Sequence, residues 1–341
     1  MKALVSMKDI AFTLGVSVVT VSKALSGKEG VGEELRAKII DEATRQGYRK
    51  NANASDMRKG TSHDIGIIVR EHSLAEHRVS TTLIQGIIKN LTSLGYYAIE
   101  EIITKEQERK GILPKIAQEN KVEGIIFAGF LKPSYVMKIQ KTGIPTLLVD
   151  FSSPTSNDDS IICDNVYGSY LLTRHLISLG HEHIVFVGNP LFDDNNMDRY
   201  LGYIKALKEQ GLTEYPSIND VNDLGDSILI EINSKASAYV CASSKTAFGL
   251  EKQLQSLGKR IPEDVSIVTF NDDVYSQIAS PPLTAFHVDY NEMAYLSAIT
   301  MVGKVSEKTH VGRKTISGKL VVRESSSRDC QNVIYNISRI G

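Results

Sequence analysis

Hydrophobic and polar positions follow two different patterns along the 341-residue chain. In residues 7–48, apolar side chains recur three or four positions apart, which is typical of short amphipathic helices. From residue 64 onward, short apolar runs alternate with stretches of helical spacing, which predicts strands and helices in turn. We therefore expect a small all-α segment followed by a much longer α/β segment.

Residues 7–27 predict two short helices joined by a tight turn. Gly15 supplies the positive φ that ends the first helix, and Ser17 is a natural N-cap for the second. The buried stripe of the second helix is formed by residues 21, 24 and 25, which are Val, Ala and Leu. Its other faces carry Val18, Val19, Thr20, Ser22 and Lys23.

These outward faces, together with Ser17, are the candidate DNA-binding surface. Short apolar and hydroxyl side chains near the start of such a helix suit base edges and thymine methyl groups, whereas a lysine suits phosphates. The alternative interpretation is a small helical hairpin whose polar face is only solvated.

A third helix is expected between Gly32 and Gly47. Its apolar residues at helical spacing are Leu35, Ile39, Ile40 and Ala43. Tyr48 can close the core of the three helices, which is so small that we expect it to depend on dimerisation and DNA for order. Residues 49–62 are polar, with Met57 as the one large apolar side chain, and are expected to form a linker.

The longer segment repeats strand and helix signals up to its end. Strands are predicted at residues 65–69, 97–103, 122–127, 146–149, 184–187, 238–242, 265–270, 283–287 and 319–322. Helices are predicted at residues 83–94, 167–179, 199–208, 247–257 and 293–302. This alternation favours parallel sheets that are covered by helices on both faces.

The formal net charge of −1 conceals an asymmetry between the two segments. Residues 1–60 carry 11 Lys and Arg against 7 Asp and Glu, whereas the remainder carries 28 against 33. A basic head on an acidic body is typical of a DNA-binding domain joined to a domain that does not bind DNA. No apolar run approaches the roughly 20 residues that span a bilayer, and residues 1–6 lack the apolar core of a secretion signal. We therefore expect a cytoplasmic protein.

Residues that often carry chemistry give little support for an enzyme. Cys163 and Cys241 lie in apolar runs that predict buried strands, and Cys330 has no partner at a paired spacing, so we interpret them as core thiols. The sequence at residues 181–183, His-Glu-His, falls in a helix-to-strand turn, where a surface loop is favoured over a metal site. Phosphate-loop, nucleophile-elbow and dinucleotide fingerprints are lacking, so we expect no catalytic residue, no metal and no cofactor.

The run from Asp9 to Gly27 reads D-I-A-x-x-x-G-V-S-x-x-T-V-S-x-x-L-x-G. This string resembles the N-terminal signature of the LacI/GalR family of bacterial transcriptional regulators, and the resemblance continues through Gly47-Tyr48-Arg49 and Asn51. It implies a helix-turn-helix head followed by a bilobed body of the periplasmic sugar-binding fold, with chain crossovers near Cys163, near Asp289 and near the last strand. It also implies that Asn51 belongs to the DNA-binding surface.

The resemblance further implies a hinge in residues 49–62 and an effector site between the lobes. In the family, paired hinge helices enter the minor groove and wedge a leucine into a central base step, and Met57 occupies that position here. Asp150, Arg199 and Asp272 match family positions that contact effector. Such a site needs carboxylates and planar donors, because each sugar hydroxyl both donates and accepts. The alternative for each of the three is a helix cap or a solvated loop charge.

One candidate departs from the family pattern. Where the family often has Asn-Asp after a strand of the second lobe, this chain has Ser243-Ser244, so hydroxyls replace an amide and a carboxylate. We expect Ser243 to contact an effector that differs from the best-known ones.

The sequence thus predicts a helix-turn-helix head at residues 1–48, a hinge at 49–62 and a bilobed effector-binding and dimerisation body at 63–341. The predicted function is a homodimeric repressor of carbohydrate genes that binds a two-fold symmetric operator and a sugar-like effector, without a membrane partner. Two alternatives stay open. One is a global carbon-catabolite regulator with a phosphoprotein corepressor, and the other is a sugar-binding protein that does not bind DNA.

Overall fold

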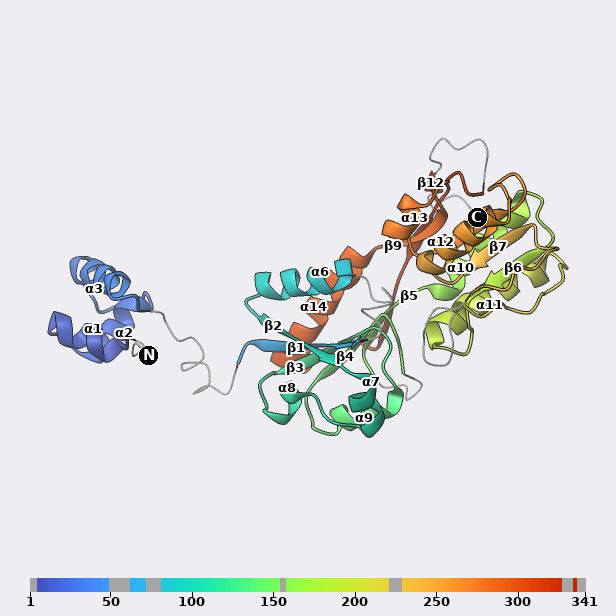
Figure 1. Ribbon diagram of the computed structural model, residues 1–341. Helices are drawn as coiled ribbons and strands as arrows, with labels where there is room; N and C mark the ends of the chain where they lie inside the picture. Colours follow the sequence, from blue (N-terminus) through green and yellow to red (C-terminus); the bar gives the residue numbers. More distant parts are fainter. Residues whose placement is uncertain are drawn as a thin grey trace. The chain divides into compact units, whose positions relative to one another are not determined.

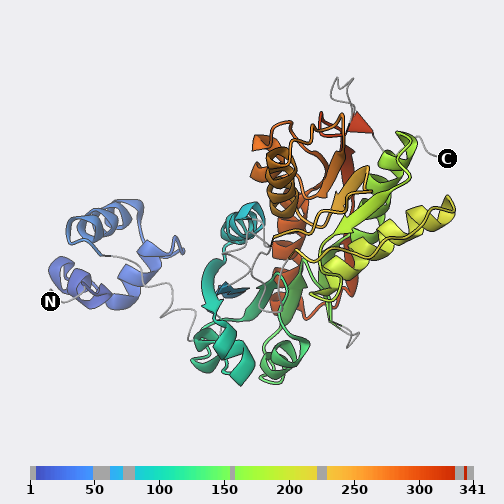
Figure 2. The ribbon, with the colours of Figure 1, turned by 45° about the vertical axis from the view of Figure 1, so that its right-hand side comes forward.

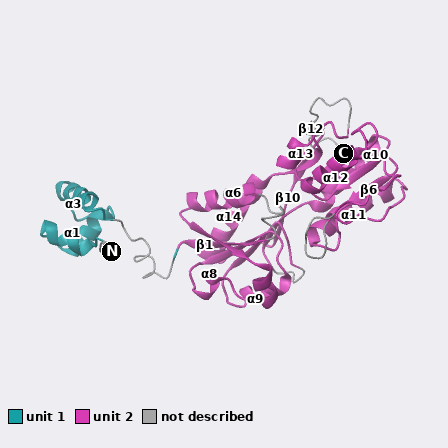
Figure 3. Ribbon diagram, in the orientation of Figure 1, with its two compact units in different colours: residues 1–62 teal, residues 63–341 magenta. Residues whose placement is uncertain are grey.

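The computed structural model describes residues 5–48, 62–71, 81–153, 158–220, 229–326 and 334–335. The chain forms two compact units, which we call unit 1 (residues 1–62) and unit 2 (residues 63–341) (Figures 1 and 3). Asn51, Met57 and Cys330 lie outside the described residues.

Unit 1 consists of three helices around a small apolar core. They are α1 (Met7–Leu14), α2 (Val18–Leu25) and α3 (Glu33–Arg45). The residues Ile10, Val21 and Ile39 are fully buried between them, and Tyr48 packs against this cluster as predicted. Ile40 lies in α3, as its helical spacing predicts, but it is 47% exposed and does not belong to the core cluster.

Polar groups fix the ends of these helices. The hydroxyl of Ser17 accepts a hydrogen bond from the backbone N–H of Thr20 at 3.0 Å, so the predicted N-cap of α2 is present. Gly15 has a φ of 63°, as the predicted turn requires. The guanidinium of Arg36 donates to the carbonyls of Ala24 and Lys28, at 3.0 and 2.6 Å, which satisfies groups that helix α2 leaves open at its end.

Unit 2 contains two six-stranded sheets. The first has the order β10 (Arg313–Ile316), β5 (Ser160–Cys163), β4 (Thr146–Val149), β3 (Gly124–Ala128), β1 (Asp64–Arg70) and β2 (Tyr97–Ile103). The second has the order β12 (Ile334–Tyr335), β11 (Gly318–Val321), β9 (Thr284–Val288), β8 (Ser266–Phe270), β7 (Ala238–Cys241) and β6 (Ile184–Val187). All pairings are parallel except those of β11 with β9 and β12.

Helices cover both faces of each sheet (Figures 1 and 2). The first sheet carries α6 (Thr81–Ser93) and α14 (Tyr290–Glu307) on one face, and α7 (Lys105–Lys110), α8 (Lys115–Gln118) and α9 (Pro133–Gln140) on the other. The second carries α10 (Asn165–Ser178) and α11 (Asp194–Glu209) on one face, and α12 (Ser244–Ser256) and α13 (Val274–Ile278) on the other. We call the two assemblies lobe 1 and lobe 2.

The chain passes between the lobes at three places. It leaves lobe 1 after Cys163, returns to it after Val288 through Asp289, and crosses again between Ile316 and Gly318. These are the three crossovers that the family resemblance implied. Cys163 and Cys241 are buried in β5 and β7, which confirms their interpretation as core thiols.

The differences from the predicted elements are local. The short helices α7, α8, α9 and α13 and the strand β10 were not predicted, because each is too short to show a clear period. Helix α11 begins at Asp194, with Asp193 as its N-cap, so the prediction that Arg199 opens this helix is wrong. Among the described helices, none is both long enough and apolar enough to cross a membrane.

Gly202→Ala is expected to destabilise the protein, whereas Gly249→Ala is not. A Cβ at Gly202 would lie 2.1 Å from the carbonyl oxygen of Val166, where α11 crosses α10, so backbone would have to move. We expect a loss of ~2 kcal/mol or more, as for overpacked cores. Gly249 in α12 has nothing within 4 Å of the added atom, so alanine there should stabilise the helix by up to ~1 kcal/mol. Denaturant unfolding of both variants measures the difference, and equal stabilities would contradict this account of the α10–α11 contact.

Candidate functional site

Helix α2 presents the predicted DNA-binding side chains in two groups. Val18 and Val19 are 38% and 65% exposed at the start of the helix, and Lys23 is exposed one turn later. Thr20 and Ser22 are half-buried, and the hydroxyl of Thr20 lies 2.8 Å from that of the cap residue Ser17. The outer face is therefore apolar near its N-terminus and cationic further on, and the two predicted hydroxyls nearest the turn are occupied in holding the helix.

Asp150 lies at the carboxyl end of β4, where the first lobe meets the second. Its φ is 64°, and Asp150 is only 4% exposed. Among the described residues, no group hydrogen-bonds to its buried Oδ1 atom. Burial raises the pKa of this carboxyl to about 7, although the positive charge of Arg199 acts in the opposite direction.

Arg199 lies in the second turn of α11 and is 7% exposed. Its Nε atom donates to Oδ1 of Asn165 at 2.8 Å, and its Nη1 atom donates to the carbonyl of Ala242 at 2.7 Å. The guanidinium carbon lies 4.0 Å from the centroid of the Phe270 ring. Each of these partners comes from the carboxyl end of a strand or the start of a helix, so Arg199 is held where the loops of lobe 2 converge.

Two asparagines connect Asp150 to Arg199. Nδ2 of Asn195 donates to the backbone carbonyl of Asp150 at 2.7 Å, and Nδ2 of Asn165 donates to Oδ1 of Asn195 at 3.0 Å. Asn165 then accepts the hydrogen bond from Arg199, so one chain of hydrogen bonds runs from lobe 1 into lobe 2. The sequence reasoning missed both asparagines. For Asn195 the available signal is the run of polar residues before the helix predicted at 199–208, which forms the first turn of α11.

Asp272 belongs to a different group of hydrogen bonds. Its carboxylate accepts from Nη2 of Arg323, at 2.8 and 2.9 Å, and from the hydroxyl of Ser276 at 2.8 Å, and Nδ1 of His287 lies 3.5 Å away. Burial acts to raise the pKa of Asp272, but hydrogen bonds from His287, Arg323 and Ser276 together hold it well below its usual range.

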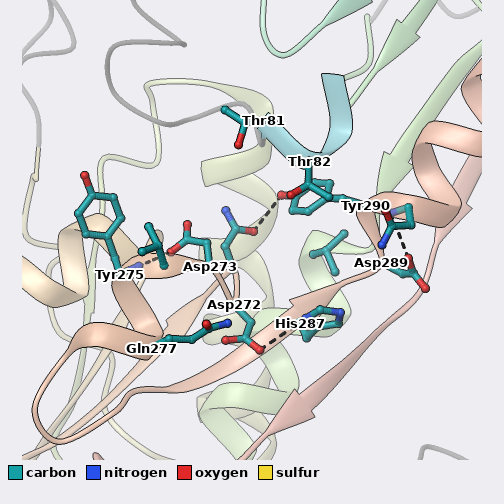
Figure 4. A pocket seen from close by; sticks show the side chains of 13 residues that line it. Thr81, Thr82, Asp272, Asp273, Tyr275, Gln277, His287, Asp289 and Tyr290 are labelled. Carbon is teal, nitrogen blue, oxygen red and sulfur yellow. Dashed lines mark hydrogen bonds and ion pairs between the residues drawn. The ribbon is translucent and has the colours of Figure 1, made fainter. Parts of the chain in front are cut away.

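A pocket of about 360 Å³ lies beside Asp272 (Figure 4). Asp272 and His287 point toward each other on one side of it, and Thr81 and Thr82 of α6 lie on the opposite side, so the pocket lies between the lobes (Figure 4). The described residues that line it do not include Asp150, Arg199 or Ser243.

Tyr290, at the start of α14, is one of the residues that line this pocket. Its hydroxyl donates to Oδ1 of Asn271 at 3.1 Å, and its ring lines the pocket. Burial raises the pKa of Tyr290 well above its ordinary value, and the charge of Asp150 raises it further.

Ser243 caps helix α12. Its hydroxyl accepts from the backbone N–H of Thr246 at 3.2 Å, and the hydroxyl of Thr246 donates to the buried carboxylate of Asp220 at 2.6 Å. Its neighbour Ser244 donates to Asp273 at 2.6 Å. Asp150 and Arg199 are thus brought together, whereas Asp272 and Ser243 take part in separate hydrogen-bond groups.

The two histidines at residues 181–183, where the sequence favours a surface loop over a metal site, have different surroundings. The ring of His181 is within 3.1 Å of the hydroxyl of Ser237 and 3.0 Å of that of Ser266, whereas His183 is exposed. Burial lowers the pKa of His181. Among the described residues, no group of three or more His, Cys, Asp or Glu could hold a metal ion.

Two family descriptions match parts of this chain. Residues 6–51 match bacterial regulatory proteins of the lacI family, and residues 173–326 match a periplasmic binding protein-like domain. The HTH-type transcriptional regulator RegA of Clostridium saccharobutylicum is 27% identical, over 94% of this chain and 99% of RegA. The HTH-type transcriptional repressor PurR of Vibrio vulnificus (strain CMCP6) is 26% identical, over 94% of this chain and 98% of PurR.

Solved structures share the fold over nearly the whole chain. The lac repressor dimer bound to operator and the anti-inducer ONPF superposes with a TM-score of 0.81 at 21% identity, covering 95% of this chain and 99% of that one. The complex of the transcriptional regulator CelR with cellobiose has a TM-score of 0.67 at 21% identity, with coverages of 94% and 99%. The fold is therefore that of a helix-turn-helix head joined to a periplasmic-binding-protein-like body.

Asp150→Asn is expected to change how stability depends on pH. The folded protein holds a proton on Asp150 up to about pH 7, whereas an unfolded chain loses it near pH 3.9. Parent stability should therefore fall, by up to ~4 kcal/mol, as the pH rises from about 4 to about 7, and Asp150→Asn should lack this loss. Denaturant unfolding at about pH 5 and about pH 8 measures the difference between the two proteins.

His175 changes the stability in the opposite direction over part of this pH range, but its effect is the same in the parent and in Asp150→Asn and cancels when the two are compared. Its Nε2 atom lies 2.9 Å from the hydroxyl of Ser326, and burial lowers its pKa to about 4. Its contribution to stability therefore increases as the pH rises from about 4 to about 6.5, equally in parent and variant. A stability difference between Asp150→Asn and the parent that is the same at both pH values would contradict the assignment.

Proposed function

The chain belongs to the lacI family of bacterial regulatory proteins, and on this basis we propose that it is a homodimeric repressor whose hold on a two-fold symmetric operator is controlled by a small effector. The observation that carries the proposal is the exposed outer face of α2, a short helix capped by Ser17 and fixed at its other end by Arg36. A protein that acts on operator DNA works in the cytoplasm and needs no catalytic residue.

In this proposal, α2 enters the major groove. Val18 and Val19 contact base edges and thymine methyl groups at its start, and Lys23 contacts a phosphate. A hairpin that is only solvated has no need for two exposed valines on consecutive positions, since such side chains favour burial. Asn51 and Met57 stay predicted DNA contacts of the hinge.

We propose the interlobe pocket and the Asp150–Arg199 cluster as the effector site. The structure of CelR, which shares the fold, is that of its complex with cellobiose. The pocket in this chain is lined by hydroxyl, amide and carboxylate groups of the kind that bind sugar hydroxyls. An effector with different affinities for two arrangements of the lobes shifts the balance between them and so changes operator affinity. The chain of hydrogen bonds from Asp150 through Asn195 to Arg199 is the contact that such a shift would break or strengthen.

The DNA face is tested by selecting a duplex from a randomised pool with the parent protein. Lys23→Ala should weaken selected and random duplexes alike and lower the salt slope by about one, because it removes one phosphate contact. Val19→Arg should change the selected sequence, because Val19 is the more exposed of the two valines. Lys38→Ala, in a lysine that pairs with Glu34 on α3, is the matched control and should bind like the parent. An unchanged selected sequence for Val19→Arg would contradict the placement of the base-reading face.

The effector site is tested by a thermal-shift screen of the full chain against sugars, because a ligand of the native state raises its apparent stability. For any sugar found, Arg199→Lys should lower the affinity ~10-fold or more, since lysine keeps the charge but cannot bind Asn165 and Ala242 at once. Arg174→Lys, at a half-exposed arginine of lobe 2, is the control. Calorimetry that finds undiminished affinity for Arg199→Lys would exclude Arg199 from the site.

A further inference from the structure

His63, the first residue of unit 2, has an unusual backbone conformation. Its φ is 55°, in the left-handed region that residues other than glycine rarely adopt, and it directly precedes strand β1. This conformation costs roughly 1 kcal/mol for a residue with a Cβ atom, so surrounding contacts must hold it. His63 is also the point at which the chain from the DNA-binding unit, which ends at Ser62, enters lobe 1.

Three contacts fix His63, each from a segment that precedes a neighbouring strand. Its backbone N–H donates to Oε1 of Glu123 at 2.8 Å, and its carbonyl accepts from the N–H of Tyr97 at 2.8 Å. Its ring lies 5.2 Å from that of Tyr96, at an angle of 54°. The carboxylate of Glu123 lies close to this ring pair, since after burial it is the main cause of the raised pKa of Tyr96. We call His63, Tyr96 and Glu123 the exit site.

Strand β1 does not need the exit site to find its register. It pairs in parallel with β2 from Asp64 to Arg70 and with β3 from Ile65 to Val69, and its side chains after Asp64 are buried. The N–H of Glu123 also donates to the carbonyl of Asp64 at 2.9 Å, which holds the start of the strand by itself. The contacts to His63 therefore serve mainly to fix the direction in which the chain leaves lobe 1.

We propose that His63, Tyr96 and Glu123 strengthen operator binding by restricting the conformation of the chain where it leaves lobe 1. The inference rests on the proposed function, namely that unit 1 binds half of a two-fold symmetric operator. Two such units must reach half-sites at a fixed spacing, so every free torsion at the exit adds entropy that binding has to remove. Restricting the exit in both subunits raises the effective concentration of one head at its half-site once the other is bound.

The charge of Glu123 and its hydrogen bond to His63 predict different effects on DNA affinity when the carboxylate is removed, which makes the proposal testable. A carboxylate repels phosphates, so if Glu123 acted only through its charge, its removal would tighten binding to any duplex or leave it unchanged. If Glu123 acts by holding the N–H of His63, removing its oxygen weakens binding to the selected operator, whereas binding to random duplex is not weakened. Glutamine keeps an oxygen that can accept this hydrogen bond.

The experiment compares Glu123→Leu, Glu123→Gln and Glu106→Leu with the parent on the duplex that the parent selects. Glu106 is an exposed carboxylate of lobe 1 in α7, so its variant controls for the loss of one negative charge. Fluorescence anisotropy should show a ~10-fold loss of operator affinity for Glu123→Leu, which corresponds to releasing about one residue of backbone. Glu123→Gln should stay within about threefold of the parent, and Glu106→Leu should match it. Thermal melting and the response to any effector should be unchanged in all three.

Equal or tighter operator binding by Glu123→Leu would overturn the proposal, and so would a loss in Glu123→Gln as large as that in Glu123→Leu. If Glu123→Leu does not fold, His63→Gly provides the test. Glycine adopts the same φ but lacks the ring that contacts Tyr96, so it should reproduce the loss, and parent-like binding would overturn the proposal. Failure of the parent to select any duplex would contradict the proposed function instead.

Discussion

The buried guanidinium of Arg199 is the group on which the geometry between the two lobes depends. A charge removed from water must be met by acceptors and an opposite charge, and each acceptor here comes from a different element, namely the start of α10, the end of β7 and the ring on β8. Asn165 accepts a hydrogen bond from Arg199 and donates one to Asn195, and Asn195 donates to the backbone carbonyl of Asp150. Any movement of lobe 1 relative to lobe 2 therefore changes the surroundings of a buried charge.

Asp150 makes this arrangement sensitive to what binds beside it. Burial disfavours its charged form more strongly than Arg199 favours it, so its pKa is raised to about 7 and the carboxyl changes its charge close to neutral pH. A ligand that donates a hydrogen bond to its Oδ1 atom, which has no hydrogen-bond partner among the described residues, would stabilise the charged form. Asp272 offers no such balance, because Arg323 and Ser276 already satisfy its carboxylate.

The sequence predicted most of the fold because its signals were local. Strands β4 and β6 begin and end at the predicted residues, since buried parallel strands are short apolar runs bounded by polar or turn residues. The edge strand β2, which is mostly not buried, also matches its predicted range. The cap at Ser17 and the turn at Gly15 follow from single residues with specific roles. The site was harder to predict. The pairing of Asp272 with Arg323 joins positions far apart in the sequence. Of the two asparagines that lead to Arg199, Asn195 lies in a polar run that resembles a loop, and Asn165 is a single polar residue at the start of α10.

The return of the chain to lobe 1 through Asp289 has a consequence for how the protein is made. Lobe 1 begins at His63, yet its edge strand β10 and the helix α14 that covers one face of its sheet lie near the other end of the chain. At a usual rate of synthesis, the apolar face formed by residues such as Ile126 and Val149 emerges on the order of ten seconds before α14 can cover it. During that interval only α6 covers this face of the sheet, so the growing chain exposes apolar surface of the kind that chaperones bind. The ribosome must therefore nearly finish the protein before its first lobe is complete, whereas lobe 2 obtains α10, α11 and α12 in the order in which its strands appear.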